Sequence, residues 1–326
     1  MAVFNLVKLN KEVNEFKPAD IDYSVLINVD KEPECFNLFA DNPIAIMIDN
    51  GIGAGKPYGL SQADLVIEAP VEGGITRFLA FFDSQKLIDK IGPVRSVRPF
   101  FIDFAESYSA VLAHAGGSPE ALDKLSKASD YNLIDIDEIG HNGQYFWRDR
   151  NLPTPHNLFT NVDLLNQARQ NTAYNNQTDN LDCQELSWQW EEKLETVVSE
   201  DPDNVVIDYS IRSYEAEYKY DKEKQGYVRY QGGKEFITAE NNQILIDNVL
   251  IAFMDVKVID SEGRLKIRTA GEGEAVICQS GQCRDGEWRE PSIDQKIRFY
   301  IEDAEISLIP GKTWINIVPV GRRAEY

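Results

Sequence analysis

Long apolar runs separated by glycine-rich turns are the main pattern of the first half of the chain. Residues 43–48 form one run, and its length and its polar flanks predict a buried strand. Residues 64–71 and 75–82 form two more runs, on either side of a Glu72-Gly-Gly turn. Two such runs around a glycine turn predict a β-hairpin.

A helix, a strand and a second helix are expected after the hairpin. Residues 100–108 place their aromatic side chains on one helical face. Residues 109–114 form another short apolar run, which predicts a buried strand that ends at a glycine loop. Ser118 followed by Pro119 is typical of an N-cap and a first helical position, so we expect a second helix that runs to residue 128.

Composition divides the chain into an N-terminal arm (1–40), a first domain (41–170), a linker (171–185) and a second domain (186–326). Strands, glycine loops and helices alternate in the first domain, which indicates a mixed α/β unit. The linker is rich in Asn, Gln and Thr and shows no periodicity.

The second domain carries short, closely spaced strand patterns and no long helical period. We therefore predict an α+β protein, with a mixed α/β N-terminal domain followed by a smaller, mostly antiparallel all-β C-terminal domain. Trp288 and Trp314 lie in or beside these patterns and are expected in the core, with carbohydrate stacking as the alternative. The predicted strands are 203–209, 213–220, 227–230, 243–259, 264–270, 273–279, 295–301 and 313–319.

Charge narrows the classes of function. The 326 residues include 33 Lys and Arg against 54 Asp and Glu, so the formal net charge is −21. A nucleic-acid binder needs a basic stripe, which argues against that class of partner. No apolar run is long enough to predict a transmembrane helix, and the first residues show no signal-peptide pattern. The pattern alone is compatible with the cytoplasm or with an envelope protein whose anchor has been removed.

Cys278 and Cys283 are close in the sequence, with four residues between them that include a glycine. This spacing suits a tight hairpin closed by a disulfide, if the compartment is oxidising. Two free thiols remain an alternative, and a metal site is disfavoured because no second Cys/His pair has suitable spacing.

Arginines concentrate in the first domain. Arg77, Arg95, Arg98 and Arg148 lie near glycines, prolines or loops, where their planar guanidinium groups suit carboxylates and phosphates. We expect them to form an anion-binding pocket, or else to pair with nearby acids as structural bridges. Two polar residues of the neighbouring motifs are added as candidate ligand contacts: Ser118 and Asn157.

Histidines supply the candidates for proton transfer, because imidazole titrates near neutrality. His114 ends an apolar run before a glycine loop, and His156 follows a proline in a polar segment. If the protein is an enzyme, we expect His114, His156 and Glu72 to be its catalytic residues. His141 lies in a Gly-His-Asn-Gly loop typical of an exposed turn.

Asp49 and Glu68 lie at or near the ends of apolar runs, where a carboxylate must be solvated, paired or bound to a ligand. They are candidate oxygen ligands for a divalent cation such as Mg²⁺, with salt bridges to the arginines as the alternative. The glycine-rich stretch Gly51–Lys56 lacks the spacing of a phosphate-binding loop.

Several motifs follow one another in a specific order along the chain. Those in the first half are Pro43-Ile-Ala-Ile-Met-Ile-Asp-Asn50, Gly59-Leu-Ser-Gln-Ala-Asp-Leu-Val-Ile-Glu-Ala-Pro-Val-Glu-Gly-Gly-Ile-Thr-Arg-Phe78, Ile91-Gly-Pro-Val-Arg-Ser-Val-Arg-Pro99, His114-Ala-Gly-Gly-Ser-Pro-Glu120, Phe146-Trp-Arg-Asp-Arg150 and Pro155-His-Asn157. Those in the second half are Tyr227-Val-Arg-Tyr230, Asp247-Asn-Val-Leu-Ile251 and Pro310-Gly-Lys-Thr-Trp314. This order resembles the YerB family, bacterial proteins of unassigned function proposed to be lipoproteins. The resemblance covers roughly residues 42–320 and implies an extracytoplasmic protein associated with the cell envelope.

The order of strand, arginine-rich segment and His-Ala-Gly-Gly loop is also similar to the LytR–CpsA–Psr phosphotransferases, by analogy of order and composition only. That similarity would place Arg95, Arg98 and Arg148 against a pyrophosphate. Two hypotheses follow. The first is a binding or accessory protein that recognises an anionic cell-wall component or an envelope protein. The second is an enzyme acting on a phosphate- or glycan-containing envelope substrate by phosphotransfer or hydrolysis.

Overall fold

The computed structural model describes residues 39, 42–127, 132–171 and 201–326. The predicted arm lies outside the described residues except for Phe39, and the predicted linker lies outside them except for Asn171. The boundary that we expected between the two domains therefore falls in a part of the chain that the structure does not describe.

Apolar runs of the first half form strands where the sequence predicts them, and both predicted helices are present. The predicted hairpin is the antiparallel pair β2 and β3, which confirms the expectation from the glycine turn. The described first half contains β1 (Ile44–Asp49), β2 (Leu65–Pro70), β3 (Thr76–Phe82), α2 (Pro99–Glu106), β4 (Val111–His114), α3 (Pro119–Leu125), β5 (Ile134–Asp137), β6 (Trp147–Arg148), β7 (Leu158–Phe159) and α4 (Val162–Asn171).

Described residues of the second half form strands and a short 3-10 turn but no α-helix, which agrees with the predicted all-β character. Four strands were not predicted: the two-residue β11, β19 and β21, and the long β17, whose residues are mostly polar and of which only Cys283, Trp288 and Glu290 are buried. The strands are β8 (Val205–Ile207), β9 (Ala216–Asp221), β10 (Gly226–Gln231), β11 (Lys234–Glu235), β12 (Leu245–Ile246), β13 (Asn248–Met254), β14 (Val256–Val258), β15 (Leu265–Ile267), β16 (Gly271–Gln279), β17 (Gln282–Glu290), β18 (Arg298–Ile301), β19 (Ala304–Glu305), β20 (Thr313–Pro319) and β21 (Ala324–Glu325).

One sheet of eleven strands joins both halves of the sequence, in the order β19-β18-β17-β16-β13-β20-β2-β3-β1-β4-β5. The junction is the parallel pair β2 and β20, with Leu65 opposite Thr313 and Glu68 opposite Asn316. A second sheet, β11-β10-β9-β8-β21, is built from the second half alone. The two halves of the sequence, which we expected to form two domains, therefore contribute strands to one common sheet.

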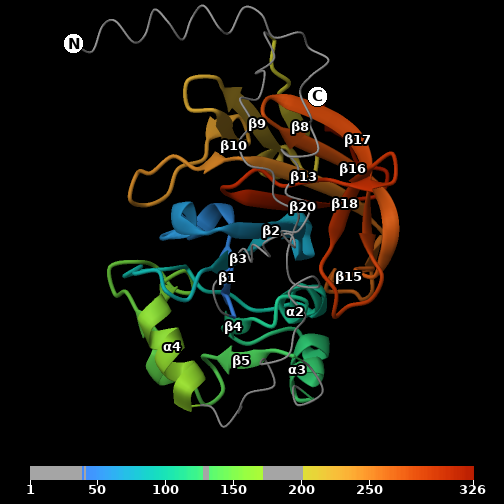
Figure 1. Cartoon of the computed structure of the whole chain (residues 1–326). Helices are drawn as coiled ribbons and strands as arrows, with labels where there is room; N and C mark the ends of the chain where they lie inside the picture. The colour runs from blue at the N-terminus through green and yellow to red at the C-terminus, as the bar shows by residue number, and fades with distance from the viewer. Residues whose placement is uncertain (1–38, 40–41, 128–131, 172–200) are drawn as a thin grey trace, which may run out of the picture. The chain divides into compact units, whose positions relative to one another are not determined.

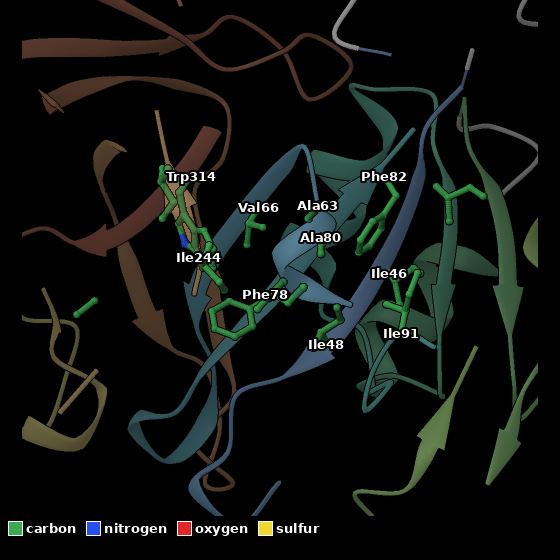
Figure 2. Packing of buried hydrophobic residues seen from close by; sticks show 14 of the residues in the cluster. Ile46, Ile48, Ala63, Val66, Phe78, Ala80, Phe82, Ile91, Ile244 and Trp314 are labelled. Carbon is green, nitrogen blue, oxygen red and sulfur yellow. The ribbon is translucent and has the colours of Figure 1, made fainter. Parts of the chain in front are cut away.

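Both faces of the central strands β13, β20, β2, β3, β1 and β4 are buried, which explains why these strands are mostly apolar runs rather than alternating ones. Ile46, Phe78 and Trp314 belong to the core on one face, together with α4 and the second sheet (Figure 2). Met47 and Leu79 belong to the core on the other face, together with α2 and α3. Figure 1 shows α4 on one side of β4 and β5 and the other two helices on the opposite side.

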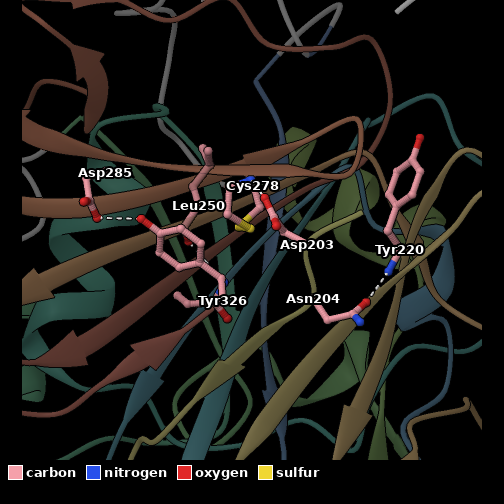
Figure 3. The surroundings of a disulfide bond; sticks show 9 residues. Asp203, Asn204, Tyr220, Leu250, Cys278, Asp285 and Tyr326 are labelled. Carbon is pink, nitrogen blue, oxygen red and sulfur yellow. Dashed lines mark hydrogen bonds between the residues drawn. A yellow bond between two sulfur atoms is a disulfide. The ribbon is translucent and has the colours of Figure 1, made fainter. Parts of the chain in front are cut away.

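A disulfide joins Cys278 and Cys283, directly opposite each other on β16 and β17 (Figure 3). Of the three alternatives left open by the spacing, the structure shows the disulfide-closed hairpin. The hairpin is also tied to the second sheet, because Asp203 accepts a hydrogen bond from the backbone N–H of Cys283 at 2.9 Å.

Glu290, at the end of β17, is fully buried, and neither of its carboxylate oxygens has a hydrogen-bond partner. Burial, with Asp103 of α2 nearby, raises the pKa of the Glu290 carboxyl from 4.5 to about 9. The folded protein therefore holds this carboxyl in its neutral form at pH 7.

We expect this group to make the protein less stable as the pH rises. Between pH 4.5 and about 9 the unfolded chain releases the Glu290 proton while the folded protein keeps it, so the free energy of unfolding falls across that window. In Glu290→Gln this dependence should disappear and the slope should flatten by up to about 1.4 kcal/mol per pH unit. Urea denaturation between pH 5 and 9 measures the slope. The exposed Glu223→Gln is the matched control, and an unchanged slope in Glu290→Gln would contradict the prediction.

Candidate functional site

Side chains from five segments of the first half meet beyond the end of β1. Asp49 is the last residue of β1, and Arg77 lies opposite it on β3. The turn Glu72–Gly74, the segment between β3 and α2 and the loop that leads into β7 add the remaining members. We call this group the arginine cluster; its members are Asp49, Glu72, Arg77, Arg95, Arg98 and His156.

Asp49 is the central carboxylate of the arginine cluster and is only 4% exposed. Its Oδ2 atom accepts a hydrogen bond from His156 Nδ1 at 2.7 Å and lies 3.0 Å from Arg95 Nε. Its Oδ1 atom accepts the backbone N–H of Gly51 at 2.8 Å. Because the carboxylate accepts from Nδ1, the imidazole is oriented with its Nε2 atom away from Asp49.

Arg98 and Glu72 form a two-pronged ion pair. Arg98 Nε donates to Glu72 Oε1 at 2.6 Å, and Arg98 Nη2 donates to Oε2 at 2.9 Å. Burial by itself raises the pKa of the Glu72 carboxyl, but the hydrogen bonds and the positive charge of Arg98 outweigh it and hold that pKa below its usual value. Glu72 is therefore an ionised partner of Arg98, and the geometry does not favour the proton-transfer role that we expected for it.

Arg77 is the most enclosed cation of the arginine cluster, at 7% exposure. Its Nη1 atom donates to the carbonyl oxygen of Ser96 at 2.5 Å, and its Nε atom has no hydrogen-bond partner. Burial, followed by the positive charges of Arg98 and Arg95, lowers the pKa of the Arg77 guanidinium to about 9. It stays charged at neutral pH, in surroundings with too little negative charge.

The charge of the arginine cluster confirms that shortage. Three guanidinium groups face two carboxylates, so the balance is 3 − 2 = +1 before any charge on His156 is counted. The Nε atom of Arg95 also lacks a hydrogen-bond partner, although it lies at ion-pair distance from Asp49. A protein with a net charge of −21 thus contains a local excess of positive charge with unused donors.

His114 has a different environment from His156. Its ring is fully buried at the end of β4, with Nε2 at 2.7 Å from Asp135 Oδ1 and Nδ1 at 2.9 Å from the carbonyl oxygen of Gly116. Burial lowers the pKa of the imidazole, but the hydrogen bond and charge of Asp135 raise it further than burial lowers it. Both nitrogens are engaged by protein atoms, so His114 fastens β4 to β5 and its loop and has no ring atom available for proton transfer with a ligand.

Three other predicted contacts have partners within the protein. Arg148 is about half exposed and donates to Glu138 at 3.0 Å and to Asn157 at 3.3 Å. Asn157 is buried beside His156 and also donates to the backbone of the preceding loop. Ser118 caps α3 by accepting the backbone N–H of Ala121, as the sequence predicts.

Glu68 lies in a separate buried network that connects the two halves. Arg229 Nη2, on β10, donates to both Glu68 oxygens, at 3.0 and 2.8 Å, and neither side chain is exposed. Trp314 Nε1 donates to the second oxygen at 3.2 Å, while the Thr76 hydroxyl donates to the first at 2.7 Å. The Arg229 guanidinium also lies 4.3 Å from the ring centroid of Phe236.

This network removes Glu68 from the predicted metal site. All of its oxygen positions face donors of the protein, and Asp49 is engaged by His156 and Arg95. No three His, Cys, Asp or Glu side chains gather as metal ligands in the described part of the chain. Asp49 and Glu68 therefore form ion pairs with arginines, which was the alternative to a metal site, and the described residues offer no donor set for Mg²⁺.

Two residues that take part in these contacts, one at the arginine cluster and one in the buried network, were missed at the level of sequence. Tyr214 comes from the second half, and its hydroxyl accepts the backbone N–H of Ile52 at 3.2 Å, at the edge of the arginine cluster. Nothing in the local pattern marks this tyrosine. Arg229 did carry a signal, since it is a lone charge within an apolar strand pattern, Tyr227-Val-Arg-Tyr230, and such a charge needs a buried partner.

Comparison with known proteins places this architecture in a two-part family. Residues 33–175 match the N-terminal domain model of a protein of unknown function (DUF3048), and residues 205–315 match its C-terminal domain model. The chain belongs to this family, which includes YerB. It is 33% identical over 282 residues to the "Putative lipoprotein YerB" of Bacillus subtilis (strain 168), covering 85% of this chain and 81% of that protein.

A solved structure supports the same assignment. The crystal structure of the YerB protein from Bacillus subtilis matches with a TM-score of 0.75 and 27% identity, over 90% of this chain and 96% of that one. Among the described residues, none of the helices is both long and apolar enough to span a membrane.

Breaking the Glu68–Arg229 pair should destabilise the protein strongly. Glu68→Gln leaves the Arg229 charge buried without compensation, and we expect a loss of about 3–5 kcal/mol in the free energy of unfolding. The double variant Glu68→Gln/Arg229→Met removes both charges and should lose less than the two single losses added together. Urea denaturation measures these values.

The control for this pair is an exposed one. Arg322 and Asp208 are 42% and 45% exposed, so Arg322→Met should change stability by about 1 kcal/mol or less. Additive losses in the double variant would show that Glu68 and Arg229 are not coupled.

Proposed function

We propose that the arginine cluster binds an anionic group, a phosphate or a carboxylate, as part of a binding or accessory protein of the cell envelope. The observation that carries this proposal is the excess of positive charge around Arg77, whose Nε donor has no partner. An anion bound at the partly exposed side chains beside Arg77 would supply the missing negative charge.

Partial exposure of the arginine cluster supports binding from solvent. The side chain of Arg95 is 27% exposed and that of His156 is 21% exposed, whereas Asp49 beneath them is buried. Asp49 therefore fixes two partly exposed side chains while it is itself screened from a ligand. Such a fixed arrangement of donors suits recognition, because little side-chain freedom is lost on binding.

The envelope location in this proposal comes from the family. The relative from Bacillus subtilis carries the name "Putative lipoprotein YerB", and the disulfide between Cys278 and Cys283 suits an oxidising compartment. The ligand that we propose is accordingly an anionic cell-wall component or the anionic surface of an envelope protein. The strongly acidic chain argues against a nucleic acid.

Replacing Arg95 should weaken anion binding while leaving the fold intact. A hydrogen bond to a charged group contributes about 1.5–3 kcal/mol, so Arg95→Gln should weaken the binding of inorganic phosphate or acetate by about tenfold or more. His156 remains on Asp49 in this variant, so the carboxylate keeps a partner. Calorimetric titration measures the affinity, and thermal melting checks the fold.

The matched control is Arg289→Gln, which removes an arginine paired with Glu287 and Asp303 and should leave the affinity unchanged. Equal anion affinity in Arg95→Gln and the parent protein would refute the site.

A second candidate function, an enzyme acting on phosphate- or glycan-containing envelope substrates, is favoured by the Asp49–His156 pair. A carboxylate that holds Nδ1 leaves Nε2 as the atom that exchanges a proton with a substrate. Of the three residues predicted for proton transfer, His156 alone keeps such an atom, since Glu72 and His114 are occupied by protein partners.

Turnover separates the two functions. If the second holds, the protein hydrolyses or transfers phosphate from a phosphorylated glycan, and His156→Gln lowers kcat by at least about a hundredfold, the usual scale of general acid–base catalysis. Product release is followed with and without Mg²⁺. Binding without turnover by the parent protein would favour the first function.

A further inference from the structure

Two isoleucines beside the arginine cluster are exposed to an extent that core packing does not explain. The side chain of Ile52 is 69% exposed, and that of Ile211 is 53% exposed. Single exposed apolar residues are common on protein surfaces, so exposure alone identifies nothing. These two differ from other exposed residues because both are hydrogen-bonded through their backbones to Tyr214, at the edge of the arginine cluster.

Ile52 lies on the side of the arginine cluster formed by Asp49 and His156. It begins a 3-10 turn (Ile52–Ala54) directly after Gly51, whose backbone N–H is bound by Asp49. The next residue, Gly53, is so close to the imidazole that a Cβ atom there would lie 3.7 Å from His156 Nε2.

Ile211 lies next to the part of the arginine cluster formed by Glu72 and Arg98. The 3-10 turn Glu72–Gly74 follows β2, and a Cβ atom at Gly74 would lie 4.0 Å from Ile211 Cγ2. Ser210 also donates to the carbonyl oxygen of Gly74. Ile211 is therefore fixed next to the turn whose Glu72 holds Arg98.

Tyr214 ties both isoleucines to one another. Its hydroxyl accepts the backbone N–H of Ile52 at 3.2 Å, and its own N–H donates to the carbonyl oxygen of Ile211 at 2.8 Å. The tyrosine itself is buried. The two residues that carry the exposed side chains are thus joined through one buried tyrosine, and each lies next to a segment of the positively charged site.

We infer that the ligand of the arginine cluster is an amphiphile, with an anionic head on the partly exposed Arg95, beside Arg77, and an apolar chain that lies over Ile52 and Ile211. This inference rests on the proposed anion-binding function and adds the class of ligand. An apolar chain would remove both isoleucines from water, which favours binding in proportion to the area covered. The positive charge beside them complements the head, so charge and apolar surface select the two ends of one molecule.

Paired ligands of different chain length test the inference. We expect octyl phosphate to bind at least tenfold more tightly than methyl phosphate, both used below the concentration at which octyl phosphate forms micelles. Octanoate and acetate repeat the comparison with a carboxylate head and show which head is preferred. Calorimetric titration of the full chain gives each affinity.

The double variant Ile52→Ser/Ile211→Ser should bind methyl phosphate as the parent protein does and lose the gain from the octyl chain. Its matched control is Leu87→Ser, which removes an 82% exposed leucine in the loop beyond the far end of β3 and should keep the gain.

The outcomes separate this inference from the proposed function. Equal affinities for methyl and octyl phosphate, or a chain gain that survives the double isoleucine variant, would overturn the amphiphile and leave the anion site standing. Failure of methyl phosphate, acetate and both octyl ligands to bind would overturn the anion site together with the inference.

Discussion

Glu68 on β2 and Arg229 on β10 meet where neither side chain reaches water. A charge that leaves water is stable only when an opposite charge and hydrogen bonds replace its hydration. Strands from the two halves of the chain must therefore come together at this position. The same place joins the two sheets, because Trp314 on β20 donates to Glu68 and packs near the Arg229 guanidinium.

The arginine cluster is attached to that pair through neighbouring backbone positions. Asn50, which follows Asp49, donates to the Thr76 hydroxyl and to Gln231 of the second sheet. Thr76, which precedes Arg77, donates to Glu68. At the end of β1 and the start of β3, one residue of each adjacent pair thus contacts the buried network and the other belongs to the arginine cluster. This coupling helps to hold Asp49 and Arg77 in place.

Prediction from sequence succeeded where the signal was local. The apolar runs gave the strands of the hairpin, and Ser118 was recognised as a cap because the N-cap pattern needs only four neighbouring residues. It failed for β17, a mostly polar strand with three buried residues whose place in the sheet is set by its pairing with β16. It also could not rank His114 against His156, because both follow apolar or proline-containing segments and differ only in what folding places around their rings.

The sequence by itself determined the strand content, the all-β second half and the concentration of arginines near glycine and proline turns, since these depend on neighbours along the chain. Whether an arginine meets an acid or a ligand was decided by tertiary structure alone. Arg98 forms an ion pair with Glu72 and Arg148 forms one with Glu138, whereas Arg77 is buried with a donor that has no hydrogen-bond partner. The reason is that Coulomb attraction and desolvation depend on distance in space, and residues remote in sequence, such as Asp49 and His156, become neighbours only when the sheet is assembled.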